Sequence, residues 1–252
     1  MKKLLLGSLL ASASFASTAT IVEMQTSQGI IVINLFDQDT PNTVENFLSY
    51  IDDEAYNQTV IHRSINNFVI QGGGFTFSDD FDAIETKPAI INEPVFSNVK
   101  GTIAMAKLGG NPDSATSQWF FNMSDNSAGS SQLDTQNGGF TVFGQITAAS
   151  QVTLDNIAAL VHCGETPVVG ITSEQCSSND VTISSTNLVS IQSVSVLDDD
   201  PNSSQGLTVT LNTLIDDDTS PSEPVSESSS GGGMAWLLGA FLLVLPRLKR
   251  TK

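Results

Sequence analysis

The most informative stretch of the sequence is VIHRSINNFVIQGGGF, which occupies residues 60–75. Its short apolar runs are broken by asparagine, serine and glycine, a pattern typical of strands joined by tight turns. The same pattern continues to residue 146. The stretch also holds Arg63, the single arginine between residues 17 and 230. This region is therefore predicted to form several strands, with a rare cation among them.

Regular elements are predicted on the N-terminal side of this region. Residues 20–36 contain two runs of strand character separated by turn residues 27–29, which predicts a hairpin. Thr40 and Pro41 predict the start of a helix, because threonine is a good N-cap and proline fits the first helical turn. The apolar residues of this helix recur at helical spacing and should face a core: Val44, Phe47, Leu48 and Ile51.

A second helix and a last strand are predicted on the C-terminal side. Ser150 is expected to cap the helix, with Val152, Ile157 and Leu160 on one face. Residues 189–197 alternate between apolar and polar side chains, as in a strand. Two helices among many short strands predict a mainly β fold, a closed antiparallel barrel with helical lids.

Several further motifs follow residues 60–75 in order: GTIAMAK at 101–107, SATSQWFF at 114–121, LD at 133–134 and VFG at 142–144. Together these motifs resemble the signatures of the cyclophilin family of peptidyl-prolyl isomerases, in its bacterial exported form. The likeness runs from about residue 21 to residue 197, and it covers an insertion at 161–188 poorly. It implies a closed eight-stranded antiparallel barrel capped by two α-helices. It also implies activity on the peptide bond before proline, with no cofactor and no metal.

The resemblance assigns catalysis to Arg63, with Gln71 orienting it. Resonance gives the bond before proline a barrier of about 18–20 kcal/mol, and twisting the bond returns a lone pair to the proline nitrogen. A guanidinium beside that nitrogen can donate a hydrogen bond that the planar ground state cannot accept. The alternative is that Arg63 forms a structural ion pair with one of the 27 acidic residues.

The resemblance also implies a set of substrate-binding residues. An apolar socket should receive the proline ring, and glutamine amides and backbone groups should hold the peptide. The residues at the matching positions are Phe68, Val69, Ala106, Gln118, Phe120, Leu133 and Phe140. The alternative for the apolar members is that they belong to the ordinary core of the barrel. His62 should point to the opposite face from Arg63, because side chains alternate along a strand.

Composition and charge exclude several classes of function. The chain has 252 residues and a net charge of −17. This charge argues against a protein that binds nucleic acid by neutralising phosphates. Two cysteines and two distant histidines are too few for a cysteine-rich zinc site or a histidine-rich metal centre. The resemblance implies proline-containing polypeptides as partners, and the negative charge argues that no nucleic acid is bound. Nothing in the sequence indicates a dimer, so we expect a monomer.

Both ends of the chain resemble targeting segments. Residues 1–19 have a basic start, an apolar stretch and small residues near a cleavage site, which predicts a signal peptide. Residues 231–252 combine glycines, a short apolar block and a basic end. They resemble the glycine-rich C-terminal sorting signal (GlyGly-CTERM) of Gram-negative exported proteins. This resemblance implies that the tail lies in the membrane transiently, until a rhomboid-like intramembrane protease removes it and the protein is attached to the surface or released. The alternative is a permanent membrane-spanning helix. Both predict the periplasm or the cell surface, with the chain anchored in the inner membrane or released.

The remaining segments complete the predicted organisation. Residues 20–197 form the isomerase domain, and 198–230 form a mostly flexible acidic stalk that contains a strand-like piece at 207–214. A calcium-binding role for the two aspartate triplets of the stalk is a minor alternative. Cys163 and Cys176 lie in the insertion, and export to an oxidising compartment favours a disulfide between them.

Three functions are compatible with these residues. The first is an active prolyl isomerase that assists the folding of exported proteins. The second is a surface-displayed module that binds proline-containing segments with little turnover, as the acidic stalk and the sorting tail suggest. The third is a structural surface protein whose groove has lost its function.

Overall fold

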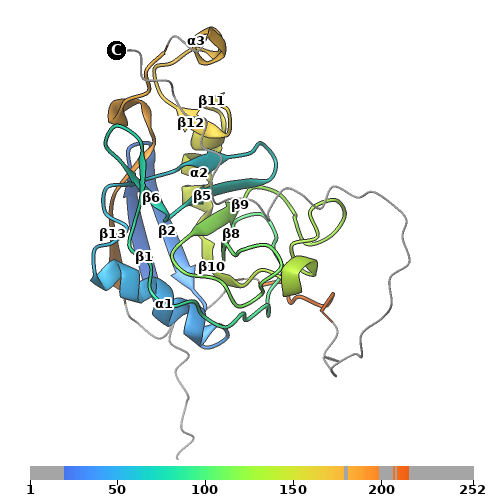
Figure 1. The fold of residues 1–252 in the computed structure, drawn as a ribbon. Coiled ribbons are helices and arrows are strands. Elements are labelled where there is room, and N and C mark those ends of the chain that lie inside the picture. The colour runs from blue at the N-terminus through green and yellow to red at the C-terminus, as the bar shows by residue number, and fades with distance from the viewer. Residues whose placement is uncertain (1–19, 179–180, 199–206, 208, 216–252) are drawn as a thin grey trace, which may run out of the picture.

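The computed structural model describes residues 20–178, 181–198, 207 and 209–215. In this part of the chain, eleven strands form one curled antiparallel sheet in the order β4-β5-β9-β8-β10-β2-β1-β13-β3-β6-β7 (Figure 1). The fold is mainly β, as predicted. The closed eight-stranded barrel is not confirmed, because β4 and β7 are the end strands of a half-barrel. The insertion, and not β7, covers the outer edge of β4, with Ser64 N donating to Glu165 O at 2.7 Å.

The elements of the large sheet are short, in keeping with the frequent turn residues. Its strands are β1 (Ile21–Thr26), β2 (Gly29–Leu35), β3 (Thr59–Val60), β4 (Arg63–Ser64), β5 (Val69–Gly72), β6 (Phe75–Phe77), β7 (Phe81–Ala83), β8 (Thr102–Met105), β9 (Trp119–Asn122), β10 (Val142–Ile146) and β13 (Ser190–Asp198). The described helices are α1 (Pro41–Asp52), α2 (Ala148–Ala158) and α3 (Ser173–Ser178), with 3-10 turns η1 (Gln136–Gly138) and η2 (Ser185–Asn187). Both the predicted hairpin and the predicted last strand are confirmed as β1–β2 and β13.

The main core is formed by buried side chains of the sheet together with those of α1 and α2. Its largest fully buried side chains are aromatic: Phe47, Tyr50, Tyr56, Trp119, Phe121 and Phe143. The Phe47 ring lies 5.0 Å from that of Phe143, and the Trp119 ring lies 5.2 Å from that of Phe121. Tilted and edge-on aromatic contacts of this kind make a stiff core. The short strands therefore rest on a rigid base.

Helix α1 begins where the sequence predicted, with Thr40 as N-cap and Pro41 in the first turn. The Thr40 side chain does not cap the helix. A distant carboxylate does so instead: Glu93 accepts hydrogen bonds from Asn42 N at 3.2 Å and from Thr43 N at 2.9 Å. It also accepts from the side chains of the same two residues at 2.7 Å each. A negative charge here satisfies orphan amides and complements the helix dipole.

Helix α2 departs from the prediction at its start and on its buried face. Thr147, and not Ser150, is the N-cap, and the Thr147 hydroxyl accepts from Ser150 N. The Ser150 hydroxyl instead accepts from Val32 N at 2.8 Å and so ties the helix to β2. The helix therefore begins earlier than expected and is rotated, so Val152 is 61% exposed while Leu154 is fully buried.

The insertion forms a small structure of its own. It contains a hairpin of β11 (Val161–Cys163) and β12 (Thr166–Val168), followed by α3 and η2. In Figure 1 this unit stands at the top of the view, at the end of the molecule opposite α1. Val168, Ile171 and Leu188 of the insertion are buried together with Val60 of β3, so the unit packs against the sheet.

A piece of the predicted stalk lies against the body. Ser97 N donates to Thr210 O at 2.8 Å, and Asn212 N donates to Val95 O at 2.9 Å. These hydrogen bonds hold the strand-like piece of the stalk alongside residues 95–97. The predicted signal peptide (1–19), the rest of the stalk and the apolar tail (231–252) lie outside the described residues. Within the ranges that the structure describes, no helix has the length and apolar character needed to cross a bilayer.

The Glu93 cap predicts a specific loss of stability. Glu93→Ala should lower the free energy of unfolding by about 1–2 kcal/mol, because it removes the acceptor of the first amides of α1. Urea unfolding monitored by circular dichroism measures this. Glu85→Ala is the control, because Glu85 is exposed and should change stability by less than about 0.5 kcal/mol. Equal effects of the two variants would contradict the capping role.

His62 predicts a pH dependence of stability. Its ring lies 4.9 Å from that of Phe75, away from the face of Arg63 as expected, and burial lowers its pKa to about 3. The unfolded chain then binds more protons below about pH 6.5, so stability falls with pH. Between about pH 7.5 and about pH 5, the wild type should lose about 2 kcal/mol more than His62→Phe. Parallel losses in urea titrations would contradict this.

Candidate functional site

Strand alternation divides the residues of β5 and β9 between two faces of the sheet. On β5, Ile70 enters the main core, whereas Val69 belongs to a second apolar cluster on the other face. On β9, Phe121 faces the core and Phe120 faces the second cluster. Gln71 shares the face of Val69 by the same alternation and is the register partner of Arg63 on β4. We call this second face the groove face.

A chain of polar side chains runs across the groove face. Arg63 Nη1 donates to Gln71 Oε1 at 3.4 Å, and Gln71 Nε2 donates to Gln118 Oε1 at 2.8 Å. Each amide uses its oxygen to accept from one neighbour and its nitrogen to donate to the next. The structure therefore brings together the arginine and the two glutamines that the sequence singled out.

The second apolar cluster lies beside this polar chain. Its predicted socket members are nearly fully buried: Val69 (2% exposed), Phe120 (5%), Leu133 (1%) and Phe140 (2%). Phe68 and Ala106 are partly buried and pack against the same cluster. The rings of Phe120 and Phe140 meet edge-on at 5.8 Å. All six residues come together as expected, although the low exposure shows that much of the socket is also core.

Lys107 supports the wall of this cluster and was not predicted to do so. Its Nζ donates to the carbonyl oxygens of Asn137 and Gly139, and it lies 4.9 Å from the centre of the Phe140 ring. Burial lowers the pKa of Lys107 to about 8, and Asp113 partly offsets the shift. The ammonium is therefore mostly charged at neutral pH and holds the turn that carries Phe140.

Ala106 occupies the edge of the groove face just after β8. Its N–H donates to the carbonyl of Gln118 at 2.9 Å, which ties the loop before β9 to β8. Because the N–H is engaged within the sheet, the carbonyl is the backbone group that Ala106 can offer to an extended peptide. The predicted pairing of Ala106 with a peptide is therefore limited to its carbonyl oxygen.

Arg63 also forms an ion pair, which was the alternative prediction for this residue. Its Nε donates to Glu165 Oε2 at 2.8 Å, and the Arg63 side chain is 3% exposed whereas that of Glu165 is 41% exposed. The Phe68 ring centre lies 6.0 Å from the guanidinium carbon. The structure thus shows Arg63 both in an ion pair and in contact with Gln71. Glu165 had no local signal in the sequence, because it is one acidic residue of 27.

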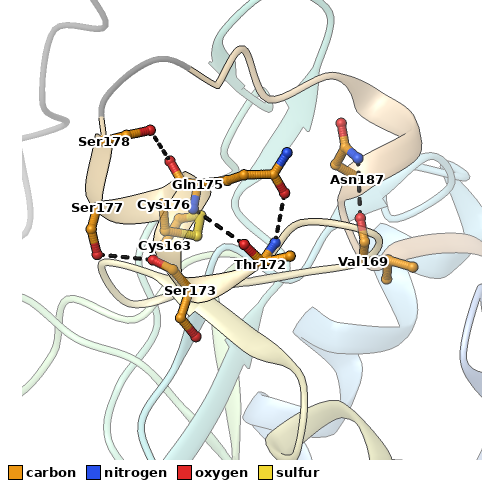
Figure 2. Close-up of a disulfide and its surroundings, with 9 residues drawn as sticks. All are labelled: Cys163, Val169, Thr172, Ser173, Gln175, Cys176, Ser177, Ser178 and Asn187. Carbon is orange, nitrogen blue, oxygen red and sulfur yellow. Dashed lines mark hydrogen bonds between the residues drawn. A yellow bond between two sulfur atoms is a disulfide. The ribbon is translucent and has the colours of Figure 1, made fainter.

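The insertion that carries Glu165 is closed by a disulfide between Cys163 and Cys176, as predicted (Figure 2). The start of α3 is held by reciprocal contacts, in which Cys176 N donates to Thr172 O at 3.0 Å and Thr172 N donates to Gln175 Oε1 at 2.9 Å. Asn187 Nδ2 donates to Val169 O at 3.0 Å and ties the end of the insertion to its middle. The hairpin with Glu165 is therefore fixed at several points.

Metal ligands do not gather in the described part of the chain. No group of three or more histidine, cysteine, aspartate or glutamate side chains there is placed to hold a metal ion. His162 stands next to a disulfide cysteine, and burial lowers its pKa.

Comparison with known proteins identifies the fold and the family. The family model described as cyclophilin type peptidyl-prolyl cis-trans isomerase/CLD matches residues 21–187. The chain belongs to this family. The prediction of a cyclophilin-type isomerase is therefore confirmed at the level of the family and its enzyme class.

Individual relatives agree with this assignment. The peptidyl-prolyl cis-trans isomerase of Acinetobacter baylyi is 43% identical over 158 residues, which cover 62% of this chain and 80% of the relative. Peptidyl-prolyl cis-trans isomerase B of Escherichia coli is 41% identical over 135 residues, covering 52% and 80%. A cyclophilin of Cryptosporidium parvum, crystallised in the presence of the dipeptide Ala-Pro, aligns with a TM-score of 0.51. It is 19% identical, covers 71% of this chain and 99% of its own, and supports the fold.

Alanine substitutions at two adjacent glycines of this cyclophilin should have different effects, one on turnover and the other on stability. A Cβ on Gly74 would lie 2.7 Å from Gln118 Cδ, whereas one on Gly73 (φ +73°) would lie 2.8 Å from the Ser117 carbonyl oxygen. Gly74→Ala should displace the flexible amide, leave the melting temperature nearly unchanged and lower turnover of an Xaa-Pro peptide by about threefold to tenfold. Gly73→Ala meets rigid backbone and should destabilise by more than about 2 kcal/mol. A Gly74→Ala variant with full turnover would show that the Gln118 position is unimportant.

Proposed function

We propose that this cyclophilin accelerates rotation about Xaa-Pro bonds in exported proteins, and that Arg63 stabilises the twisted bond. One observation carries the proposal. The guanidinium of Arg63 is held by Gln71 on the groove face, next to the apolar cluster of Val69, Phe120 and Phe140. A fixed cation beside an apolar socket is what the reaction needs, because the substrate is an apolar ring joined to a polarisable amide.

The chemistry requires no nucleophile and no redox group. The cis and trans forms of an Xaa-Pro bond differ by only about 0.5–1 kcal/mol, so both are present in an unfolded chain. The barrier of about 18–20 kcal/mol comes from resonance across the C–N bond. An enzyme can lower the barrier by stabilising the state in which this resonance is broken. The task is therefore one of positioning and electrostatics.

Arg63 meets that need through a donor that acts mainly in the transition state. As the bond twists, the proline nitrogen becomes pyramidal and can accept a hydrogen bond, which a planar amide nitrogen cannot do. A guanidinium combines a positive charge with donors that are held in one plane. The contact with Gln71 orients that plane before substrate arrives, so little reorganisation is needed during the reaction.

The rest of the groove face fits the substrate around this bond. The proline ring would enter the apolar cluster, with Phe68 and Phe140 as its walls. The carbonyl of Ala106 and the amide of Gln118 would pair with the extended backbone on either side. The crystallisation of the Cryptosporidium parvum cyclophilin in the presence of Ala-Pro supports a proline-containing ligand for this fold.

The proposed setting is the periplasm or cell surface. The export-like segments at both ends of the chain and the Cys163–Cys176 disulfide support it. Between residues 17 and 230 there are four basic residues and 27 acidic ones, a net charge of −23. Such a charge keeps a chain soluble and disfavours binding to anionic surfaces. Unfolded exported polypeptides with exposed proline segments are the clients that this setting provides.

A binding module with little turnover is the second candidate. The observation that favours it is the coverage of Arg63, which is 2% exposed and already paired with Glu165. If the guanidinium cannot reach the proline nitrogen, the groove face would bind peptides without accelerating rotation about the Xaa-Pro bond. The two functions differ in whether peptide binding is accompanied by exchange between the cis and trans forms.

Arg63→Ala separates the two candidates. In the full chain it should lower kcat/KM for an Xaa-Pro tetrapeptide by about 10²–10³-fold, because it removes a donor used in the transition state. A protease-coupled assay measures the rate, and calorimetry measures peptide affinity. Lys100→Ala, which removes a half-exposed cation paired with Asp155 at 3.7 Å, is the matched control. A wild type that binds the peptide without turnover, with an affinity that Arg63→Ala does not change, would favour the binding module. Absence of any peptide binding would favour a structural role.

A further inference from the structure

Glu165 reaches the groove face from the outer side of β4. It lies in the turn between β11 and β12 and its carbonyl accepts from Ser64 N at 2.7 Å. Next to it, Thr166 Oγ1 donates to the carbonyl of His62 at 3.0 Å. These two contacts bracket Arg63 in the sequence and fix the hairpin along the edge of β4. The position of the Glu165 side chain is therefore set by backbone contacts on both sides of the arginine.

Arg63 consequently has anchors on two flanks. Gln71, its register partner on β5, accepts from Nη1 at 3.4 Å, and Glu165 accepts from Nε at 2.8 Å on the side of the insertion. One acceptor alone leaves a planar group free to rotate about that contact. Acceptors at two different nitrogens define both the direction and the plane of the guanidinium. The shorter, charge-assisted contact is the one made by Glu165.

Glu165 also compensates the buried positive charge of Arg63. The Arg63 side chain is 3% exposed, and a covered charge is costly unless a counter-charge and hydrogen bonds compensate it. The Glu165 side chain is 41% exposed, so the carboxylate keeps part of its hydration while it neutralises the arginine. Removing the carboxylate leaves a buried cation that will turn toward water or toward another acceptor.

We propose that Glu165 is a positioning residue for the isomerase reaction. Glu165 holds Nε and so keeps the guanidinium plane turned toward the bond before proline. This inference rests on the proposed role of Arg63 in catalysis. It assigns a function to the disulfide-closed insertion, which supplies a residue to the site from outside the β4–β5–β9 part of the sheet. The opposite possibility, that Glu165 competes with substrate for the arginine, predicts a gain of activity when the carboxylate is removed.

Substitutions in the full chain test this directly. Glu165→Ala should lower kcat for an Xaa-Pro tetrapeptide by about tenfold, with KM changed less than about twofold, because only the transition state needs the guanidinium plane. Glu165→Gln retains an acceptor without the charge and should lose about threefold. Glu174→Gln is the matched control, because Glu174 lies in the same disulfide loop on α3 and is exposed. Circular dichroism verifies folding, and Glu165→Gln serves if Glu165→Ala does not fold.

A spectroscopic readout tests the contact independently of activity. The chain has three arginines, Arg63, Arg247 and Arg250, so their Nε–H signals can be resolved by nuclear magnetic resonance and assigned with an Arg63→Lys variant. The Arg63 Nε–H should exchange slowly with water in the wild type and in Glu174→Gln. It should exchange much faster in Glu165→Ala. Slow exchange that survives Glu165→Ala would overturn the proposed contact.

The outcomes separate this inference from the function on which it rests. Loss of kcat together with loss of Nε–H protection in Glu165→Ala supports it. An active wild type whose rate is unchanged or increased in Glu165→Ala overturns the positioning role and leaves the proposed function intact. A wild type that does not accelerate isomerisation, or that is unaffected by Arg63→Ala, overturns the proposed function and this inference with it.

Discussion

A buried guanidinium is the constraint around which this site is arranged. Arg63 is 2% exposed, and a charge so well covered is stable only with acceptors close to its nitrogens. Gln71 and Glu165 supply those acceptors from the sheet and from the insertion. The same contacts that make burial tolerable also fix the direction of the group. Stability and the proposed catalysis therefore depend on the same hydrogen bonds.

Alternate side chains of each short strand point to opposite faces of the sheet, so one strand contributes both to the core and to the groove face. On β9, Trp119 and Phe121 fill the aromatic core while Phe120 belongs to the groove face. The core holds the backbone, and the backbone holds the groove residues at fixed positions, which suits a site that works by orientation. Gly73 and Gly74 allow the β5–β6 turn to approach Trp119 and Gln118 where side chains would collide. The positions of the residues on the groove face are thus set by packing on the opposite side of the same sheet.

The residues of the groove face could be named from the sequence because they lie in continuous motifs that resemble the cyclophilin signatures. In the structure, the neighbouring strands β4, β5 and β9 bring Arg63, Gln71 and Phe120 together, and Gln118 bonds to Gln71. Contacts made over long sequence distances could not be predicted in this way. Glu165 and the Glu93 cap of α1 are single acidic residues among 27, with no neighbouring pattern to mark them. The closed barrel is not confirmed for a related reason, since the insertion, a long-range contact, covers the edge of β4 that a closed barrel would pair.

The most direct test is the exchange of a bound Xaa-Pro peptide between its cis and trans forms, measured by exchange spectroscopy at saturating enzyme. Arg63→Lys keeps the charge but lacks the planar set of donors. In the presence of the wild type, the peptide should exchange between its cis and trans forms far faster than the free peptide does in water. Arg63→Lys should bind the peptide with similar affinity and catalyse this exchange at least about tenfold more slowly. Equal exchange rates in the wild type and Arg63→Lys would contradict the central role of the guanidinium.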